Sequence, residues 1–171
     1  GMKYIKIPSG EITNYPYLKF ISQTNMPIIL STGMSTMSEV KKATELIKSY
    51  NKFAEINILH CTSLYPAPID SLNLLAIGEI KKKLNLCVGY SDHSQGKLAA
   101  IAAVSMGARI IEKHFTLDKN MPGPDHIASA NYEELKTLIK EIRNLEIAMG
   151  NGDKKPHAKE LDTLNIARRS W

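Results

Sequence analysis

Two histidines stand at the ends of short apolar stretches, and their positions suit binding of a divalent metal. His93 ends the stretch 86–93, and His114 lies near the end of the stretch 109–115. The intervening segment 95–107 is rich in alanine and ends in glycine, which predicts a helix. A strand–helix–strand unit is right-handed and makes its two strands parallel neighbours. Both imidazoles should then emerge at the carboxyl edge of the sheet, where α/β proteins carry out their chemistry.

We predict a strand over 109–115, and alternation along it separates its side chains into two faces. Glu112 and His114 share one face, which we expect to point into the barrel, and Lys113 and Phe115 share the other. Phe115 suits packing against outer helices. A lysine in a strand could also form a Schiff base, as in an aldolase that uses Lys113. This alternation argues against that activity, because the lysine faces away from His114.

The same alternation applies one strand earlier, where Ser91 and His93 share a face and Asp92 lies on the opposite one. A single histidine at a strand end is more often structural than a ligand. Two histidines at equivalent strand ends favour a shared metal, since imidazole suits divalent transition metals.

A second group of polar residues follows the first two predicted strands. Lys6 lies in the strand 4–8, where a buried lysine is costly unless it is paired or needed for function. Ser9 and Glu11 follow it, and the turn 31–33 follows the next strand. Hydroxyls and backbone amides beside a helix N-terminus can cradle a phosphate. The alternative is that the glycines in these segments only permit tight turns, and the pattern alone leaves both possibilities open.

The elements that must position these residues form a repeating βα pattern. We predict strands starting near residues 4, 27, 56, 86 and 109, and helices over 15–22, 36–50, 71–83, 95–107 and 131–150. Thr36 with Glu39, and Asn131 with Glu134, predict capping boxes. Such a pattern fits a (β/α) barrel or an open doubly wound sheet, and a complete eight-stranded barrel needs ~250 residues. The polar, lysine-rich segment 151–171 should be a linker or loosely attached tail.

Composition is that of an ordinary soluble domain, with 171 residues, 43% hydrophobic and 23% charged. We expect a cytoplasmic protein, because no apolar stretch approaches the ~20 residues that span a bilayer and the start lacks a signal peptide's pattern. Cys61 and Cys87 should be reduced thiols, too few for a cysteine-based zinc site. The net charge of +5 suits an anionic small molecule. The lysines at 81–83 have no interleaved aromatic residues, so we expect no nucleic-acid binding.

Six segments, in order along the chain, resemble the sialic acid synthase family, which comprises the bacterial N-acetylneuraminate, legionaminate and pseudaminate synthases. They are KIPSGE (6–11), STGM (31–34), HCTSLYP (60–66), GYSDH (89–93), EKHFT (112–116) and PGPDH (122–126). One such segment would be a weak signal, but six in the same order are specific, and the resemblance covers nearly the whole chain.

The resemblance implies a TIM-barrel enzyme that condenses phosphoenolpyruvate with an N-acetylated hexose, such as N-acetylmannosamine, to a nine-carbon α-keto acid and phosphate. His93 and His114 match the ligands of a divalent metal, usually Mn²⁺ with Mg²⁺ or Co²⁺ possible, which polarises the sugar aldehyde. Glu11 matches a carboxylate that manages a water's proton. The positions that match phosphoenolpyruvate contacts are Lys6, Ser9, Thr32, Gly33 and Ser63, and those near the sugar are Tyr65 and Asp125. We expect Ser91 to be a further substrate-binding position. Ser63 departs from members that have asparagine there.

The chain is shorter than the family's proteins. The resemblance implies that 1–150 is part of a TIM barrel, matching strands four to eight of eight, and that 151–171 leads toward an antifreeze-like domain that is absent from this sequence. An alternative to the synthase is therefore an inactive barrel fragment that retains part of the site. Because open sheet edges promote association, we expect a homo-oligomer, most simply a dimer.

Overall fold

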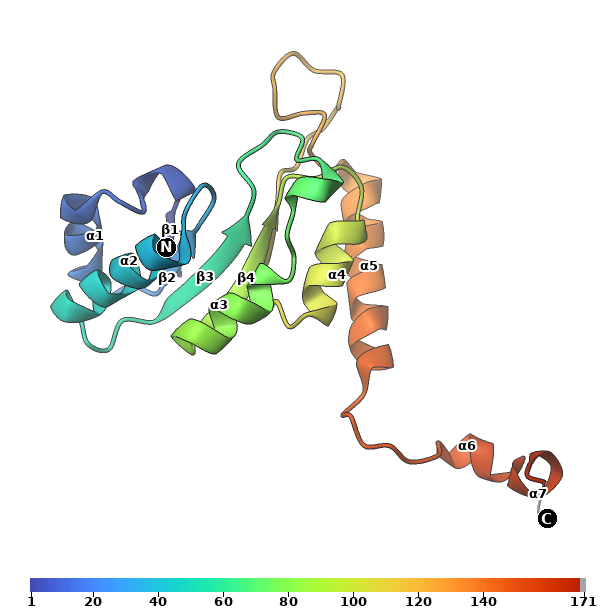
Figure 1. The fold of residues 1–171 in the computed structure, drawn as a ribbon. Coiled ribbons are helices and arrows are strands. Elements are labelled where there is room, and N and C mark those ends of the chain that lie inside the picture. The colour runs from blue at the N-terminus through green and yellow to red at the C-terminus, as the bar shows by residue number, and fades with distance from the viewer. Residues whose placement is uncertain (170–171) are drawn as a thin grey trace.

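Five parallel strands form one curled sheet in the order β1-β2-β3-β4-β5 (Figure 1). The strands are β1 (Ile5–Ile7), β2 (Ile28–Ser31), β3 (Ile56–Cys61), β4 (Cys87–Asp92) and β5 (Ile111–Lys113). The protein is described by a computed structural model that covers residues 1–169. Each strand pairs in parallel with the next strand along the chain. This order confirms the predicted α/β fold, a partial (β/α) barrel of five units.

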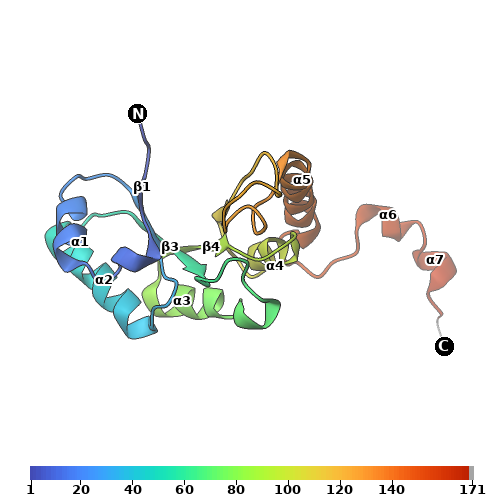
Figure 2. The same ribbon diagram turned by 90° about the horizontal axis from the view of Figure 1, so that it is seen from above.

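The helices cover the outer, convex face of this sheet, so that in Figure 2 the strands form an arc inside them. The helices of this layer are α1 (Tyr15–Ser22), α2 (Met37–Tyr50), α3 (Ala76–Leu84), α4 (Leu98–Ser105) and α5 (Tyr132–Met149). Short 3-10 turns, η1 (Ser9–Glu11) and η2 (Ile69–Ser71), follow β1 and β3. None of the helices within residues 1–169 is both long enough and apolar enough to cross a bilayer.

The hydrophobic core lies between the convex face of the sheet and the helices. Alternate strand residues such as Ile7, Leu30, Ile58 and Val88 are buried there. They pack with inward-facing helix residues, including Leu18, Ile47, Ile77 and Ala103. Since only one face of each strand contributes to this core, the residues between them are free to line the concave face with polar groups.

Both predicted capping boxes are present. Glu39 N donates to Thr36 Oγ1 at 3.3 Å and Thr36 N donates to Glu39 Oε2 at 2.7 Å. Asn131 and Glu134 exchange the equivalent bonds at the start of α5. That helix ends at Gly150, whose φ of 58° few other residues adopt readily, as the sequence predicts.

Three predicted boundaries are wrong. The predicted helix 71–83 begins only at Ala76, because Asn73 has a φ of 44° that separates η2 from α3. Similarly, α4 begins at Leu98 because Gly96 has a φ of 77°. Finally, β5 ends at Lys113, and Phe115 pairs with Ala130 in an isolated bridge. Phe115 is therefore half exposed and does not pack against the outer helices as predicted.

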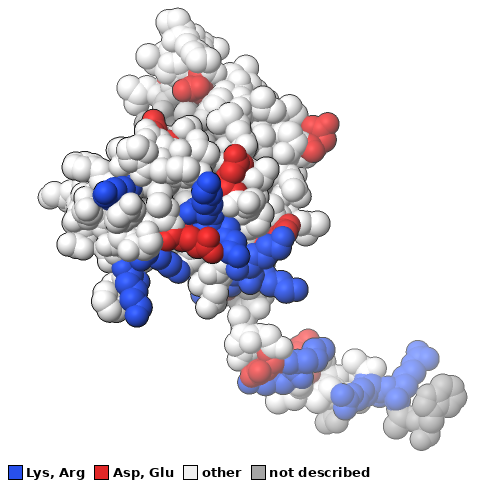
Figure 3. Space-filling model, turned by 60° about the vertical axis from the view of Figure 1, so that its left-hand side comes forward, with Lys and Arg blue, Asp and Glu red and all other residues white. Residues whose placement is uncertain are grey.

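Residues 151–169 extend away from the sheet and include two short helices, α6 (Ala158–Leu161) and α7 (Leu164–Ala167) (Figure 1). Ser170 and Trp171 of the predicted tail lie outside the described residues. On the face shown in Figure 3, basic side chains gather on the middle and lower part of the body with a few acidic ones among them, and both kinds occur on this extension. The role of the segment as a linker remains a prediction.

Candidate active site

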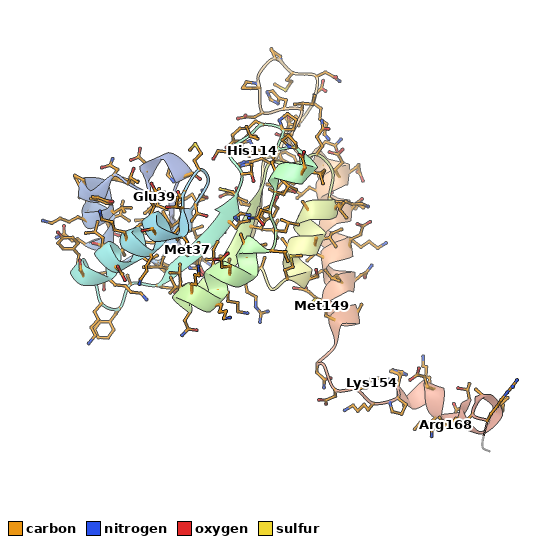
Figure 4. All side chains as sticks on the ribbon, viewed as in Figure 1. Met37, Glu39, His114, Met149, Lys154 and Arg168 are labelled. Carbon is orange, nitrogen blue, oxygen red and sulfur yellow. The ribbon has the colours of Figure 1, made fainter. Side chains whose placement is uncertain are left out.

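Each of the five strands contributes a side chain to a cavity on the concave face. These side chains are Lys6 of β1, Ser31 of β2, Cys61 of β3, Ser91 of β4 and Glu112 of β5. The cavity has a volume of about 380 Å³. Residues of the loops at the carboxyl ends of the strands complete its lining, and they are Pro8, Ser9, Gly10, Met34, Ser63, Tyr65, His93 and His114. Figure 4 shows His114 at the upper end of the sheet, far from Met149 at the end of α5.

The two histidines lie side by side, as the strand pattern predicts. The ring centroids of His93 and His114 are 5.4 Å apart, and one ring meets the other edge-on. His93 Nδ1 lies 2.7 Å from the carbonyl oxygen of Thr62, which can only accept a hydrogen bond. The proton of this imidazole is therefore on Nδ1, and Nε2 keeps its lone pair. Burial lowers the pKa of His93, although its bond to Thr62 opposes that effect, so the neutral ring is favoured.

Tyr65 and Asp125 support these two rings. The Tyr65 ring centroid is 4.2 Å from that of His93 and 5.5 Å from that of His114. Asp125 Oδ2 is 3.7 Å from His114 Nδ1. In each of the two histidines, Nδ1 faces a carbonyl or carboxylate oxygen, which leaves Nε2 as the nitrogen that could bind a metal. This arrangement is usual around protein-bound metals.

The donor set fits an open divalent-metal site rather than a closed structural one. Within residues 1–169, no group of three or more His, Cys, Asp or Glu side chains is placed to hold a metal ion. His93 and His114 would be two protein ligands, one fewer than the three usual in catalytic zinc sites, and the remaining coordination positions would fall to water or substrate.

Glu112 connects three strands across the concave face. Its Oε1 accepts a hydrogen bond from Ser91 Oγ at 2.7 Å and lies 3.3 Å from Lys6 Nζ. Both members of the ion pair are about one third exposed, so the pair sits at the open side of the cavity. The predicted inward direction of Glu112 is confirmed, although the sequence did not single it out as a site residue.

Ser9, Gly33 and Ser63 come from the loops after β1, β2 and β3 and lie close together at the cavity, which Ser9 and Ser63 line. Gly33 N donates to Ser9 Oγ at 2.9 Å, and Ser9 Oγ is 3.3 Å from Cys61 Sγ. A Cβ atom on Gly33 would lie 2.1 Å from Ser63 Oγ and 2.9 Å from Ser9 Oγ. Only glycine fits this approach, and the three predicted residues are indeed brought together.

Four predicted residues do not line the cavity: Glu11, Thr32, Gly33 and Asp125. Gly33 is bonded to Ser9 and Asp125 lies beside His114, and both of these partners do line it. Thr32 Oγ1 donates to the carbonyl oxygen of Leu59 at 2.9 Å and is buried in that contact. The carboxylate of Glu11 instead accepts a hydrogen bond from Asn14 Nδ2 at 2.6 Å. Strand alternation places Thr32 on the convex side, whereas the direction of Glu11 depends on the 3-10 turn that contains it.

The sequence placed Ser31 in the donor-rich turn 31–33 but did not name it among the individual site residues, and it is the serine that lines the cavity from β2. It is 3% exposed, and its Oγ has no hydrogen-bond partner within residues 1–169. A buried hydroxyl without a partner is unusual and points to a ligand. Counting the alternation along β2 would have found it, because Ser31 shares a face with the inward Ile29.

On the opposite face of the sheet, Lys113 forms a buried ion pair with Asp92. Lys113 Nζ is 2.8 Å from Asp92 Oδ2, and their side chains are 4% and 0% exposed. The predicted outward direction of both residues is confirmed. Because Lys113 is paired there and does not line the cavity, the structure gives no support to a Schiff-base aldolase.

The fold and the cavity together define a (β/α)-barrel enzyme segment, in which polar residues from successive strands converge at the carboxyl end of a parallel sheet. The chain belongs to the NeuB family, whose model matches residues 1–154. The resemblance to sialic acid synthases drawn from the sequence is thereby confirmed.

Several of the relatives are named as synthases of sialic-acid-type sugars. The N,N'-diacetyllegionaminic acid synthase of Campylobacter jejuni is 52% identical over 171 residues, which cover 99% of this chain and 51% of the relative. The human N-acetylneuraminate-9-phosphate synthase is 36% identical over 155 residues, covering 90% of this chain and 43% of the relative. This chain thus spans about half the length of the curated relatives it matches.

A solved structure agrees with this assignment. The N-acetylneuraminic acid synthetase of Leptospira borgpetersenii, in complex with citrate, superimposes with a TM-score of 0.87 and 35% identity. The match covers 99% of this chain and 60% of that one. The fold of this chain is therefore that of a segment within a longer synthase.

Proposed function

We propose that this chain forms part of a synthase that condenses phosphoenolpyruvate with an N-acetylated hexose, giving a nine-carbon α-keto acid and phosphate. The main observation in support of this proposal is that one cavity holds two adjacent imidazoles beside a group of hydroxyl and ammonium donors. Membership of the NeuB family supports a reaction of this class.

The donors on β1 and β2 suit the anionic groups of phosphoenolpyruvate. Lys6 supplies a positive charge at the open side of the cavity, and Ser31 supplies a buried hydroxyl without another partner in the described chain. The substrate's carboxylate and phosphate would compete with Glu112 for Lys6, which frees the carboxylate of Glu112 inside the site. Ser9 and Gly33 would keep the adjacent loop close to the substrate.

His93 and His114 would hold the divalent metal, with Mn²⁺ as our first choice and Mg²⁺ or Co²⁺ as alternatives. When bound, the metal supplies Lewis-acid polarisation of the sugar's aldehyde oxygen. Tyr65 would keep the two rings in place by packing against them, and Asp125 beside His114 would accept hydrogen bonds from the sugar's hydroxyls.

The bond changes balance without a redox partner. The electron pair of the C2–C3 double bond of phosphoenolpyruvate forms the new bond from C3 to the aldehyde carbon, and the aldehyde oxygen takes up a proton to become a hydroxyl. Water adds at C2, and the C2–O bond to phosphate breaks as C2 becomes a ketone. The added water gives up both of its protons in this sequence, one for the new hydroxyl and one that leaves with the phosphate, so a base must first accept a proton from it. Glu112 faces the cavity and is better placed than Glu11 to accept it, since Glu11 is bonded to Asn14.

The test is turnover of phosphoenolpyruvate with N-acetylmannosamine or its 6-deoxy relatives in the presence of Mn²⁺. Released phosphate and newly formed α-keto acid should appear in equal amounts. We expect slow or absent turnover from residues 1–171 alone, and full turnover once the segments that only the longer relatives carry are added. A completed protein that neither binds phosphoenolpyruvate nor forms the α-keto acid would overturn the proposal.

A further inference from the structure

A buried ion pair lies directly before the two histidines. Asp92 and Lys113 are opposite one another in the last register pair of the β4–β5 ladder. His93 is the first residue after the end of β4, and His114 is the first residue after the end of β5. The ion pair is on the convex face and the imidazoles are on the concave one, so the cavity itself does not require the pair.

The pair also fixes the backbone on both sides of His93. Asp92 Oδ1 accepts hydrogen bonds from Ser94 N at 2.9 Å and from Ser94 Oγ at 2.6 Å. Lys113 Nζ donates to the carbonyl oxygen of Ser94 at 2.7 Å as well as to Asp92. The residues before and after His93 are therefore tied to each other, and both are tied to the strand that carries His114.

Burial makes these bonds strong and directional. Asp92 is fully buried and Lys113 nearly so, and hydrogen bonds in such surroundings are stronger than in water. Two apolar side chains could fill the same volume and still allow the strand ends to shift. Lys113 donates to two buried acceptors, Asp92 and Ser94, and both bonds keep their length only while the ends of β4 and β5 stay in the same relative position.

We infer that Asp92 and Lys113 are positioning residues that set the distance and orientation of His93 relative to His114. The inference rests on the proposed function, in which both imidazoles bind one metal. Residues that orient metal ligands without touching the metal are commonly worth ~10–100-fold in metal affinity. Loss of the Asp92–Lys113 pair should therefore weaken metal binding by at least ~10-fold without removing a ligand.

The orientation of His93 gives a readout that needs no metal. Its Nδ1–H donates to the carbonyl of Thr62, which fixes a single tautomer. If the backbone at 92–94 relaxes, that bond loosens and the ring should sample both tautomers. The ¹⁵N chemical shifts of the imidazole nitrogens, measured by long-range ¹H–¹⁵N correlation, distinguish these states.

The test compares three forms of the 171-residue chain: wild type, the double variant Asp92→Asn with Lys113→Met, and the control Ile77→Ala. The double variant removes both charges together, so neither is left buried and unpaired. Ile77 is fully buried in the core, on α3, so its truncation lowers stability without touching the strand ends. Ser94→Ala, which loses only the hydroxyl donor to Asp92, serves if the double variant does not fold.

We expect the double variant to show mixed His93 tautomers and at least ~10-fold weaker Mn²⁺ binding by calorimetry. Ser94→Ala should shift both readouts in the same direction by less, and Ile77→Ala should leave both unchanged. A folded double variant with the wild-type tautomer would overturn the inference. If the wild type binds no Mn²⁺, the proposed metal role fails, and the tautomer still decides whether Asp92 and Lys113 orient His93.

Discussion

Lys6 and Glu112 belong to the two outermost strands of the sheet, yet Lys6 Nζ lies 3.3 Å from Glu112 Oε1. In a flat sheet, side chains on β1 and β5 would be separated by three intervening strands, each about 4.8 Å from the next. Their contact is possible because the sheet curls, which brings its edges toward one another over the concave face. This curvature gathers the candidate site into one cavity.

Lys6→Met should weaken binding of phosphoenolpyruvate by ~10-fold or more, because it removes a charge-assisted contact to an anionic substrate. Folding should change little, since partly exposed ion pairs contribute only ~0–1 kcal/mol. Calorimetric titration of phosphoenolpyruvate checks this. Lys41→Met is the matched control, because Lys41 is paired with Glu45 on the surface of α2. Equal affinity in the Lys6 and Lys41 variants would contradict the assignment.

His93→Ala and His114→Ala should each abolish measurable Mn²⁺ binding, because either change leaves one protein nitrogen for the ion. Asp92→Asn should cause a smaller loss, since its side chain does not reach the cavity. Calorimetry with Mn²⁺ gives the affinities. The control is His157→Ala, which removes an exposed histidine at the start of α6. Unchanged affinity in either His93→Ala or His114→Ala would remove the metal assignment.

Stability should decrease on acidification in part through His93. Its pKa is lowered in the folded protein from an ordinary value of 6.5, so the unfolded chain takes up a proton first as pH falls. The contribution of neutral His93 to the free energy of unfolding is complete above about pH 6.5, and it is lost as pH falls toward the lowered pKa of the folded protein. Urea unfolding at several pH values checks the sign. His93→Asn should flatten this part of the profile, and an unchanged slope would contradict it.

Gly33→Ala should destabilise the fold by ~1–3 kcal/mol, because the new methyl group would overlap Ser63 Oγ. Gly78→Ala is the matched control. Gly78 lies on the exposed side of α3, where a methyl group would have no atom within 4 Å, and alanine there should stabilise the helix by up to ~1 kcal/mol. Urea unfolding of both variants measures the difference. Adding Ser63→Gly should relieve part of the Gly33→Ala loss if the overlap is its cause.

The 171-residue chain should form a homo-oligomer, most simply a dimer. Within residues 1–169, β1 and β5 each pair on one side only, so their other edges have backbone groups available for a second copy. Sedimentation velocity over a range of concentrations should show a concentration-dependent dimer. A monomer at every concentration, combined with full synthase turnover, would contradict both this expectation and the need for the additional segments.

The sequence by itself determined the features that depend on local periodicity. Alternation along β4 and β5 predicted that His93, His114 and Glu112 face one side and Asp92 and Lys113 the other. The capping boxes were equally predictable, because their partners are three residues apart. The six family segments identified the class of enzyme, but a bound metal and the substrates remain proposals.

Only the tertiary structure decided which of these residues share a cavity. The contact between Lys6 and Glu112 depends on the curvature of the sheet. Every strand contributes to that curvature, so no short segment of the sequence predicts it. Glu11 turned toward Asn14, and Phe115 became exposed when β5 ended two residues early. Alternation along β2 places Ser31 on the concave face, but only the tertiary structure shows that its hydroxyl has no hydrogen-bond partner within the described chain. The direction of Glu11 is set by a local 3-10 turn that strand and helix periodicity do not predict. The sheet curvature and the surroundings of Phe115 and Ser31 depend on contacts between residues far apart in sequence, and periodicity carries no information about those contacts.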